Sequence, residues 1–406
     1  MKTPALILLV ILAFTGCNNS SVKKKTTVPE KGTYSYDRQF LKKYNNDVIE
    51  LRNGNSALLL VAAYQGRVMT STLDGKSSFG WINYDLISSG KREEHINIFG
   101  GEDRFWIGPE GGQFSIFFEK GKEFVFDNWY VPAELDTEAF NVVKSSGTSA
   151  TFARNMHLKN YSGTRFNLHV QRSIEIMDKN SVQQLLGIDA GKLNMVAYRS
   201  SNTMKNTGDK VWTKETGLLS IWLLGMFKPS DNTIIVIPVK PGNEKELGPV
   251  VNDDYFGKIS DDRLKVKGNT VFFKGDGKSR GKIGIPPLRT TGYMGSYDAG
   301  NKVLTILKCP LPENVTDYIN SAWKLQDDPF KGDAYNAYND GPLQDGSLLG
   351  PFYELETSSP ALALKPGEEY THTQVICHFA GSEQELNAVA EKLLGVSLKD
   401  ITDSGL

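Results

Sequence analysis

The residue types best suited to chemistry gather in one short stretch, residues 99–112, which reads FGGEDRFWIGPEGG. Between two pairs of glycines it holds several side chains that can bond to or stack on a ligand: Glu102, Asp103, Arg104, Trp106 and Glu110. Glycine lets the backbone approach a ligand closely, an arginine can donate to hydroxyls or a carboxylate, and an indole can stack on the apolar face of a sugar. We expect a ligand site here; the alternative is a tight bend with an internal arginine–carboxylate pair.

A second candidate is the run GPFYELET at residues 350–357, which has the composition of a strand. Because side chains alternate along a strand, we expect at most one of Glu354 and Glu356 to face a cleft. Partial burial beside Tyr353 would raise the pKa of that carboxyl, as a general base requires. The alternative is that both glutamates are exposed strand residues.

The elements that must position these residues are strands. From about Tyr34 onward, apolar or alternating runs are bounded by Gly, Asn, Asp or Pro, which is typical of strands joined by turns. The clearest runs cover residues 57–64, 112–120, 164–177, 232–239 and 269–285. Helical periodicity is clear only in Asp37–Tyr44 and in Ser382–Leu394, where Ser382 is a suitable N-cap.

No repeat of 20–50 residues is visible, which disfavours a propeller or a solenoid. No long Pro- or Ser-rich linker divides the chain either. We therefore expect one large all-β domain over residues 34–400, with two large sheets packed face to face and few short helices.

The segment 350–379 resembles the C-terminal strands of the galactose mutarotase (aldose 1-epimerase-like) superfamily. Leu355-Glu356-Thr357 stands where that family carries its catalytic carboxylate, and the LKPGEEY run at 364–370 matches the turn before its last strand. The 99–112 stretch is similar to the family's Gly-Gly-x-Arg-x-Trp element, and residues 200–227 resemble its central strand, turn and strand. The resemblance implies a galactose mutarotase-like β-supersandwich of two large antiparallel sheets with a concave sugar-binding face.

The resemblance also implies a mechanism, in which Glu356 takes the proton of the anomeric hydroxyl while a histidine protonates the ring oxygen. Residues 194–210, where that histidine would lie, contain none. Asp103, Glu102 or Glu110 would then have to supply the acid, since paired carboxyls in different environments can divide into an acid and a base. The same pair would suit glycosidic cleavage at a suitable separation.

The predicted ligand is a carbohydrate, a mono- or oligosaccharide, held by Arg104 and Glu356. The other predicted contacts are Glu102, Trp106, Tyr353, Glu354, His95, Arg289 and Tyr293. Three functions stay open: a sugar epimerase-like or other sugar-modifying enzyme, a non-catalytic glycan-binding lipoprotein, and a structural envelope protein with a vestigial cleft. We predict no cofactor, because no nucleotide fingerprint or phosphate loop occurs.

The first residues have the pattern of an export signal. Lys2 precedes an apolar run at 4–14 that is too short to span a bilayer, and Thr15-Gly16-Cys17 resembles a bacterial lipobox. We expect residues 1–16 to be a lipoprotein signal peptide, Cys17 to carry the lipid, and residues 17–33 to form a flexible tether. This would make the protein a lipoprotein of the bacterial cell envelope, on the periplasmic or outer-membrane face.

Charge and cysteine usage narrow the partners further. Lys and Arg number 46 and Asp and Glu 47, giving a net charge of −1, which argues against nucleic acid. Cys309 and Cys377 each lie in an apolar run, so two buried thiols on separate strands are favoured over a disulfide. No Cys/His spacing typical of zinc occurs, and no metal site is predicted.

Overall fold

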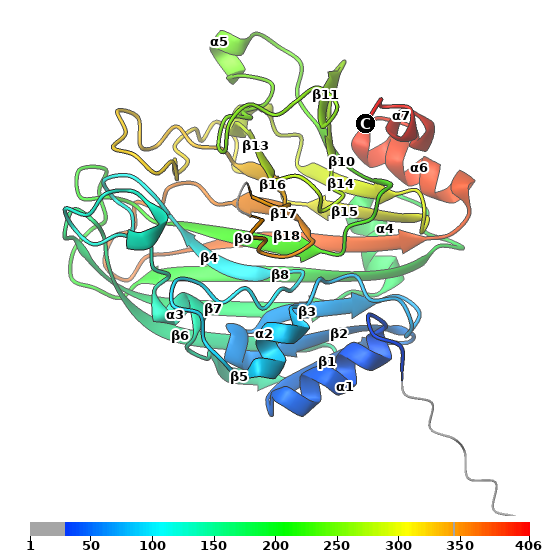
Figure 1. Ribbon diagram of the computed structural model, residues 1–406, viewed down its shortest axis with the longest axis horizontal. Coiled ribbons are helices and arrows are strands. Elements are labelled where there is room, and N and C mark those ends of the chain that lie inside the picture. Colours follow the sequence, from blue (N-terminus) through cyan, green and yellow to red (C-terminus); the bar gives the residue numbers. More distant parts are fainter. Residues whose placement is uncertain (1–28, 344–345) are drawn as a thin grey trace, which may run out of the picture.

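The structure, a computed structural model, describes residues 29–343 and 346–406. The predicted signal peptide, Cys17 and the tether up to residue 28 lie outside these ranges. The described chain forms a ten-stranded sheet, a five-stranded sheet and a small three-stranded sheet, and every strand pairing is antiparallel (Figure 1). The predicted all-β fold with two large antiparallel sheets and few short helices is confirmed.

The ten-stranded sheet has the spatial order β11 (Leu264–Lys267), β12 (Thr270–Lys274), β10 (Thr233–Pro238), β14 (Tyr293–Asp298), β15 (Val303–Lys308), β18 (Glu369–Ala380), β8 (Asn194–Asn206), β7 (Arg165–Ile176), β6 (Ser149–Lys159) and β5 (Asn141–Ser145). The five-stranded sheet has the order β13 (Gly281–Ile285), β16 (Tyr335–Asn339), β17 (Tyr353–Ser358), β9 (Ser220–Phe227) and β4 (Arg104–Gly108). The three-stranded sheet contains β1 (Val48–Asn53), β2 (Ser56–Val61) and β3 (Arg67–Thr72).

Two predicted helices are present and several unpredicted ones accompany them. The predicted pair are α1 (Tyr34–Tyr44) and α6 (Glu383–Leu394). The others are α2 (Tyr84–Ser89), α3 (Ala133–Asp136), α4 (Lys179–Leu186), α5 (Glu244–Leu247) and α7 (Leu398–Thr402), with 3₁₀ turns at Ala62–Tyr64, Phe126–Asn128 and Pro287–Arg289. None of the helices in the described ranges is long and apolar enough to cross a membrane.

Local sequence explains where α6 begins and ends. The Ser382 hydroxyl accepts the N–H of Glu385, and the Glu385 carboxylate accepts the N–H of Ser382, so two free donors of the first turn are satisfied. Gly395 ends the helix with a φ of +71°, a left-handed conformation that glycine adopts without steric strain because it has no Cβ. The shorter α4 has a similar signature, with Asp178 as N-cap and Gly187 after its end, and sequence analysis missed it.

The main hydrophobic core lies between the two large sheets. On the inner face of the five-stranded sheet, Phe105, Leu223 and Leu355 are fully buried. Polar contacts also join the sheets: Thr357 of β17 donates to Gln374 of β18 over 2.8 Å. On the far face of the ten-stranded sheet, α4, α6 and α7 cover a second apolar cluster (Figure 1).

Two further expectations can be compared with the structure. Residues 112–120 are not a strand but an irregular segment whose apolar side chains, Ile116, Phe117 and Phe118, are buried. An apolar run between glycines indicates that the side chains are buried. A loop that packs over a sheet buries such side chains too, although it does not pair with other strands. Cys309 and Cys377 are buried free thiols, as favoured from the sequence.

Candidate functional site

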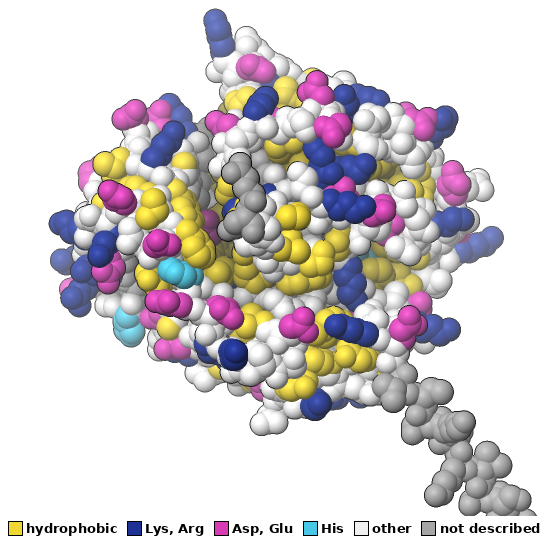
Figure 2. Space-filling view, viewed as in Figure 1, with side chains coloured by type: hydrophobic (Ala, Val, Ile, Leu, Met, Phe, Trp, Pro, Cys, Tyr) yellow, Lys and Arg dark blue, Asp and Glu magenta, His cyan; other side chains and the backbone are white. Residues whose placement is uncertain are grey.

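Strand alternation places Arg104, Trp106 and Glu356 on the outer face of the five-stranded sheet, opposite to the face of Phe105, Leu223 and Leu355. The register sets Glu356 opposite both Asn336 and Leu224, and Leu224 opposite Arg104, so these side chains form one row across the sheet. Trp106 lies opposite Trp222 in the next row. Figure 2 shows a hollow to the left of centre, in the region where β4 and β9 lie in the same view of Figure 1.

The structure corrects the expectation that Glu354 and Glu356 face opposite sides of β17. Neighbouring residues of a strand alternate, whereas residues two apart point the same way. Both carboxyls therefore belong to the outer face, and both are buried, with Glu356 at 0% and Glu354 at 7% exposure. The site thus holds two carboxyls where sequence analysis expected one.

Glu356 is bound on one side only. Its Oε2 accepts the indole N–H of Trp222 at 2.9 Å and lies 3.1 Å from Nζ of Lys282. Its Oε1 is buried and has no hydrogen-bond partner among the described residues. A buried acceptor without a partner costs free energy, so the arrangement is suited to a hydroxyl donor from a ligand.

Arg104, like Glu356, has hydrogen-bond partners for only part of its charged group. Its Nη2 donates to Asp136 at 3.2 Å, and its guanidinium lies 4.2 Å from the centre of the Trp106 ring. Its Nε and Nη1 are buried without an acceptor in the part of the chain that the structure describes. Trp106 in turn donates its indole N–H to Oε1 of Glu110 at 2.9 Å, which fixes this carboxyl at the edge of the site.

The surroundings shift the pKa values of three groups in this cluster upward. Burial raises the pKa of Glu354 well above its usual value, and the charge of Glu356 adds to this effect. Burial also raises the pKa of Glu110, against the opposing attraction of Lys282. Burial alone would lower the pKa of Lys282, but the nearby carboxylates, Glu356 first, outweigh it and the pKa is raised. The cluster therefore combines an ammonium with carboxyls that hold their protons more tightly than free carboxyls do.

A second polar group borders the row at β13 and β16. Asp333 accepts the hydroxyl of Tyr255 at 2.7 Å and the side-chain amide of Asn252 at 2.8 Å. Burial raises the pKa of Asp333 to about 6, although both hydrogen bonds oppose this. The amide of Asn336 also donates to the Tyr255 hydroxyl at 3.3 Å, which connects Asp333 to the row that contains Glu356.

Sequence analysis did not single out Lys282, Trp222 or Tyr255. Lys282 was detectable in principle, since it is the only charged residue in the apolar strand GKIGI at 281–285. Trp222 lies inside the apolar strand SIWLLGMF, and its apolar neighbours predict a residue of the hydrophobic core. Only the pairing of β9 with β17 brings its indole N–H to Glu356.

Two predicted acids lie on the other side of the sheet. Asp103 points into the sandwich, where it is ion-paired with Arg172 and accepts the Nε2 amide of Gln374 at 2.8 Å. Glu102 is also fully buried and is bonded to Ser71 and His378. These contacts give both carboxyls a structural role that joins the sheets.

Tyr353 also faces inward. Its hydroxyl is 2.8 Å from that of Ser296, and its ring lines a cavity of about 380 Å³ together with Phe227 and His378. Two pairs of polar side chains there bond to each other: Tyr353 with Ser296, and His378 with Thr305 at 2.8 Å. The unpartnered atoms of Glu356 and Arg104 distinguish the outer face of the sheet from this cavity, and we place the candidate site there.

The remaining predicted contacts lie outside the cluster. Arg289 donates to the main-chain carbonyls of Gly248 and Lys240, so it fastens two loops together. The Tyr293 hydroxyl accepts from Lys308 at 2.8 Å beside the helical layer. His95 lies among loop aromatics, with Nδ1 2.7 Å from the carbonyl of Trp129. Within residues 29–343 and 346–406, no group of His, Cys, Asp and Glu is arranged to hold a metal ion.

No curated protein matches the chain. Similar solved structures include a galactose mutarotase-like protein from Lactobacillus casei ATCC 334, at 10% identity and TM-score 0.47 over 82% of this chain and 99% of that one. A galactose mutarotase related enzyme from Lactobacillus acidophilus has 9% identity and TM-score 0.45, over 82% and 97%. A protein from Synechocystis sp. PCC 6803 has 10% identity and TM-score 0.49, over 82% and 96%.

The model of one sequence family covers nearly the whole described chain, residues 32–404. That family is described as a family of unknown function, DUF6786, and the chain belongs to it.

Proposed function

We propose that this protein binds a carbohydrate on the outer face of the five-stranded sheet and interconverts its anomers, with Glu356 as the general base. The observation that carries the proposal is the pair of half-satisfied groups, Glu356 and Arg104, in one row of that face. Because these atoms are buried, a sugar must displace the side chains that cover them; one hydroxyl then donates to Oε1 of Glu356 and another accepts from Nε or Nη1 of Arg104. The resemblance of Leu355-Glu356-Thr357 to the catalytic strand of the mutarotase superfamily supports the same role.

The proton donor in this proposal is a carboxylic acid in place of the family's histidine. Glu354 lies two residues from Glu356 on the same face, about 7 Å along the strand. Its raised pKa keeps it protonated into the pH range where an ordinary glutamate is ionised. Glu356 takes the proton of the anomeric hydroxyl, Glu354 gives one to the ring oxygen, and the bond between that oxygen and the anomeric carbon breaks. Reclosure on the other face of the carbonyl returns both protons.

A second candidate function is glycan binding without catalysis. The observation that favours it is Lys282, whose ammonium lies 3.1 Å from Oε2 of Glu356 and holds that oxygen in place. A site used only for binding would gain from this pair, since it fixes the carboxylate as a hydrogen-bond acceptor.

Polarimetry of freshly dissolved α-glucose and α-galactose tests the two functions against each other. We expect the wild-type chain to accelerate the relaxation, and Glu356→Gln and Glu354→Gln each to lose most of it. Glu175→Gln is the matched control and should keep the wild-type rate, because its carboxylate is exposed in a pair with Arg199 outside the site. Binding of either sugar by calorimetry without any acceleration would favour the non-catalytic function, and the absence of both would overturn the proposal.

We also propose that the mature protein is a lipoprotein of the bacterial cell envelope, anchored through Cys17. The support is the sequence of residues 1–17 alone, with its short apolar run and lipobox-like end. Expression of the full chain with labelled palmitate should give a labelled, membrane-associated protein. Cys17→Ser should give an unlabelled protein that fractionates without the membrane, and label retained by that variant would contradict the assignment.

A further inference from the structure

Three aromatic side chains that pack around Trp129 and His95 are exposed to solvent. Phe126 is 51% exposed, Tyr130 41% and Trp323 36%, and we call these three the aromatic surface. Figure 2 shows hydrophobic side chains gathered on the lobe at the left, where the loops after β4 lie in Figure 1. Large exposed aromatic side chains that gather in one place mark a binding surface more often than a chance exposure.

A row of packed rings connects the aromatic surface with the candidate site. Trp323 stacks on Trp129 with ring centres 5.5 Å apart, and Trp129 stacks on Phe117 at 5.5 Å and 6° between planes. Phe117 packs against Trp106 at 5.1 Å, and Trp106 lies under the guanidinium of Arg104. The linking rings are themselves buried, so the aromatic surface is joined to the side chains of the candidate site by packing through the interior.

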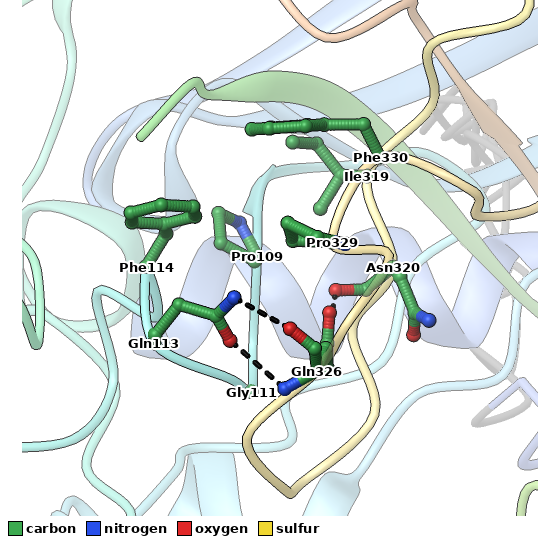
Figure 3. Close-up of a pocket in the computed structure, with 9 residues that line it drawn as sticks. All are labelled: Pro109, Gly111, Gln113, Phe114, Ile319, Asn320, Gln326, Pro329 and Phe330. Atoms are coloured by element: carbon green, nitrogen blue, oxygen red, sulfur yellow. Dashed lines mark hydrogen bonds between the residues drawn. The ribbon is translucent and has the colours of Figure 1, made fainter. Parts of the chain in front are cut away.

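The segment that carries Trp323 is fastened to the loop that carries Glu110. Figure 3 shows Gln113 and Gln326 bonded in both directions, with the Gln113 side chain donating over 2.8 Å and accepting over 3.0 Å. On the other side of Trp323, the hydroxyl of Ser321 accepts the main-chain N–H of Glu110 at 3.3 Å. The segment that carries Trp323 is thus fixed on both sides in the free protein. A ligand that stacks on Trp323 therefore loses little affinity to the ordering of this segment.

We propose that the ligand of this site is an oligosaccharide whose terminal sugar lies at Glu356 and Arg104 and whose following units stack on the aromatic surface. The inference rests on the proposed function, because it takes the Glu356 face as a sugar site. Flat rings beside hydroxyl-binding groups suit pyranose units, which present an apolar face and polar edges. A ligand confined to one sugar would leave the fastened Trp323 and the exposed Phe126 without a role in binding.

Calorimetric titration with linear gluco- and galacto-oligosaccharides, from the monosaccharide to the hexasaccharide, tests the inference on the full chain. We expect affinity to rise with length, and Trp323→Ala or Phe126→Ala to weaken binding of the longer chains by about tenfold while leaving the monosaccharide unaffected. Tyr44→Ala is the matched control, since Tyr44 is 38% exposed on α1. Because all three side chains are exposed, the variants should fold.

The outcomes separate the inference from the function on which it rests. Monosaccharide binding that depends on Glu356, with no gain from length, overturns the inference and leaves the proposed function in place. A gain with length that survives both Trp323→Ala and Phe126→Ala also overturns it, because the longer chain would then lie elsewhere. No binding of any of these sugars would overturn both.

Discussion

The ammonium of Lys282 lies 3.1 Å from Oε2 of Glu356 and 4.5 Å from the centre of the Trp222 ring. The two charged residues come from β13 and β17, with β16 between them, so the pair forms diagonally across three strands. Glu356 is fully buried and the Lys282 side chain is only 12% exposed. This pair neutralises a buried carboxylate on one oxygen and leaves the other oxygen buried without a partner among the described residues, which is the property on which the proposed site depends.

Removing the charge of Lys282 should destabilise the protein strongly. Lys282→Met leaves Glu356 buried without its cation, and we expect a loss of about 3 kcal/mol in the free energy of unfolding. Lys282→Met combined with Glu356→Gln should recover most of that loss, because neither charge then remains. Urea unfolding of the full chain measures both values.

The matched control is Lys331→Met, which breaks a pair with Asp328 whose side chains are 75% and 59% exposed. We expect less than about 1 kcal/mol there, since solvent screens an exposed pair. Equal effects of the two lysine substitutions would show that the Lys282 pair is not a buried one.

Asp103 should be needed for stability and not for sugar binding. Its carboxylate and the guanidinium of Arg172 are both at 0% exposure between the sheets. Asp103→Asn leaves Arg172 without its counter-charge, and we expect a loss of about 3 kcal/mol. Glu175→Gln is the control, because its pair with Arg199 is exposed. Calorimetry on the folded variant should give wild-type sugar affinity; lost affinity with unchanged stability would place Asp103 in the site.

Asp333 should make stability fall as the pH rises through the weakly acidic range. Its folded pKa is raised to about 6 from 3.8 by burial, so the folded state holds the proton more tightly than the unfolded state does. The associated stability is present below pH 3.8 and is lost between there and about pH 6, a change of about 3 kcal/mol. Asp333→Asn should lack this part of the pH dependence.

Urea unfolding at several pH values measures that difference, and the comparison is made between pH values within each protein. The comparison avoids the separate cost of replacing an acceptor of the Tyr255 hydroxyl, which does not vary with pH in this range. Parallel curves for wild type and Asp333→Asn would contradict the prediction.

The composition of residues 99–112 predicted Arg104, Trp106 and Glu110 as parts of one site, and the resemblance added Glu356 from a distant strand. The register of β17, β9 and β4 then puts Glu356 and Arg104 in one row. Asp103 could not be separated from Arg104 by sequence, since adjacent strand residues point to opposite faces and the pattern does not say which face is the core. Periodicity also predicted the core strands, because burial on one or both faces leaves an apolar pattern.

What the sequence could not supply was the set of contacts between distant segments. Lys282 and Trp222 meet Glu356 only through the order of strands in the sheet. The same holds for Trp129 and Trp323, which are far apart in sequence and stack because two loops are fastened together. Such pairs depend on tertiary packing, which the local periodicity of a sequence does not reveal.

That fastening depends on a close approach at Gly111, where a Cβ would lie 2.4 Å from the carbonyl oxygen of Ala322. Gly111→Ala must therefore displace the segment that carries Trp323, at a cost of about 1–3 kcal/mol. We expect faster hydrogen exchange in residues 319–330 and weaker binding of longer oligosaccharides. Gly147→Ala is the control, because nothing lies within 4 Å of its added Cβ. Unchanged exchange in Gly111→Ala would show that the loop carrying Gly111 does not hold Trp323 in place.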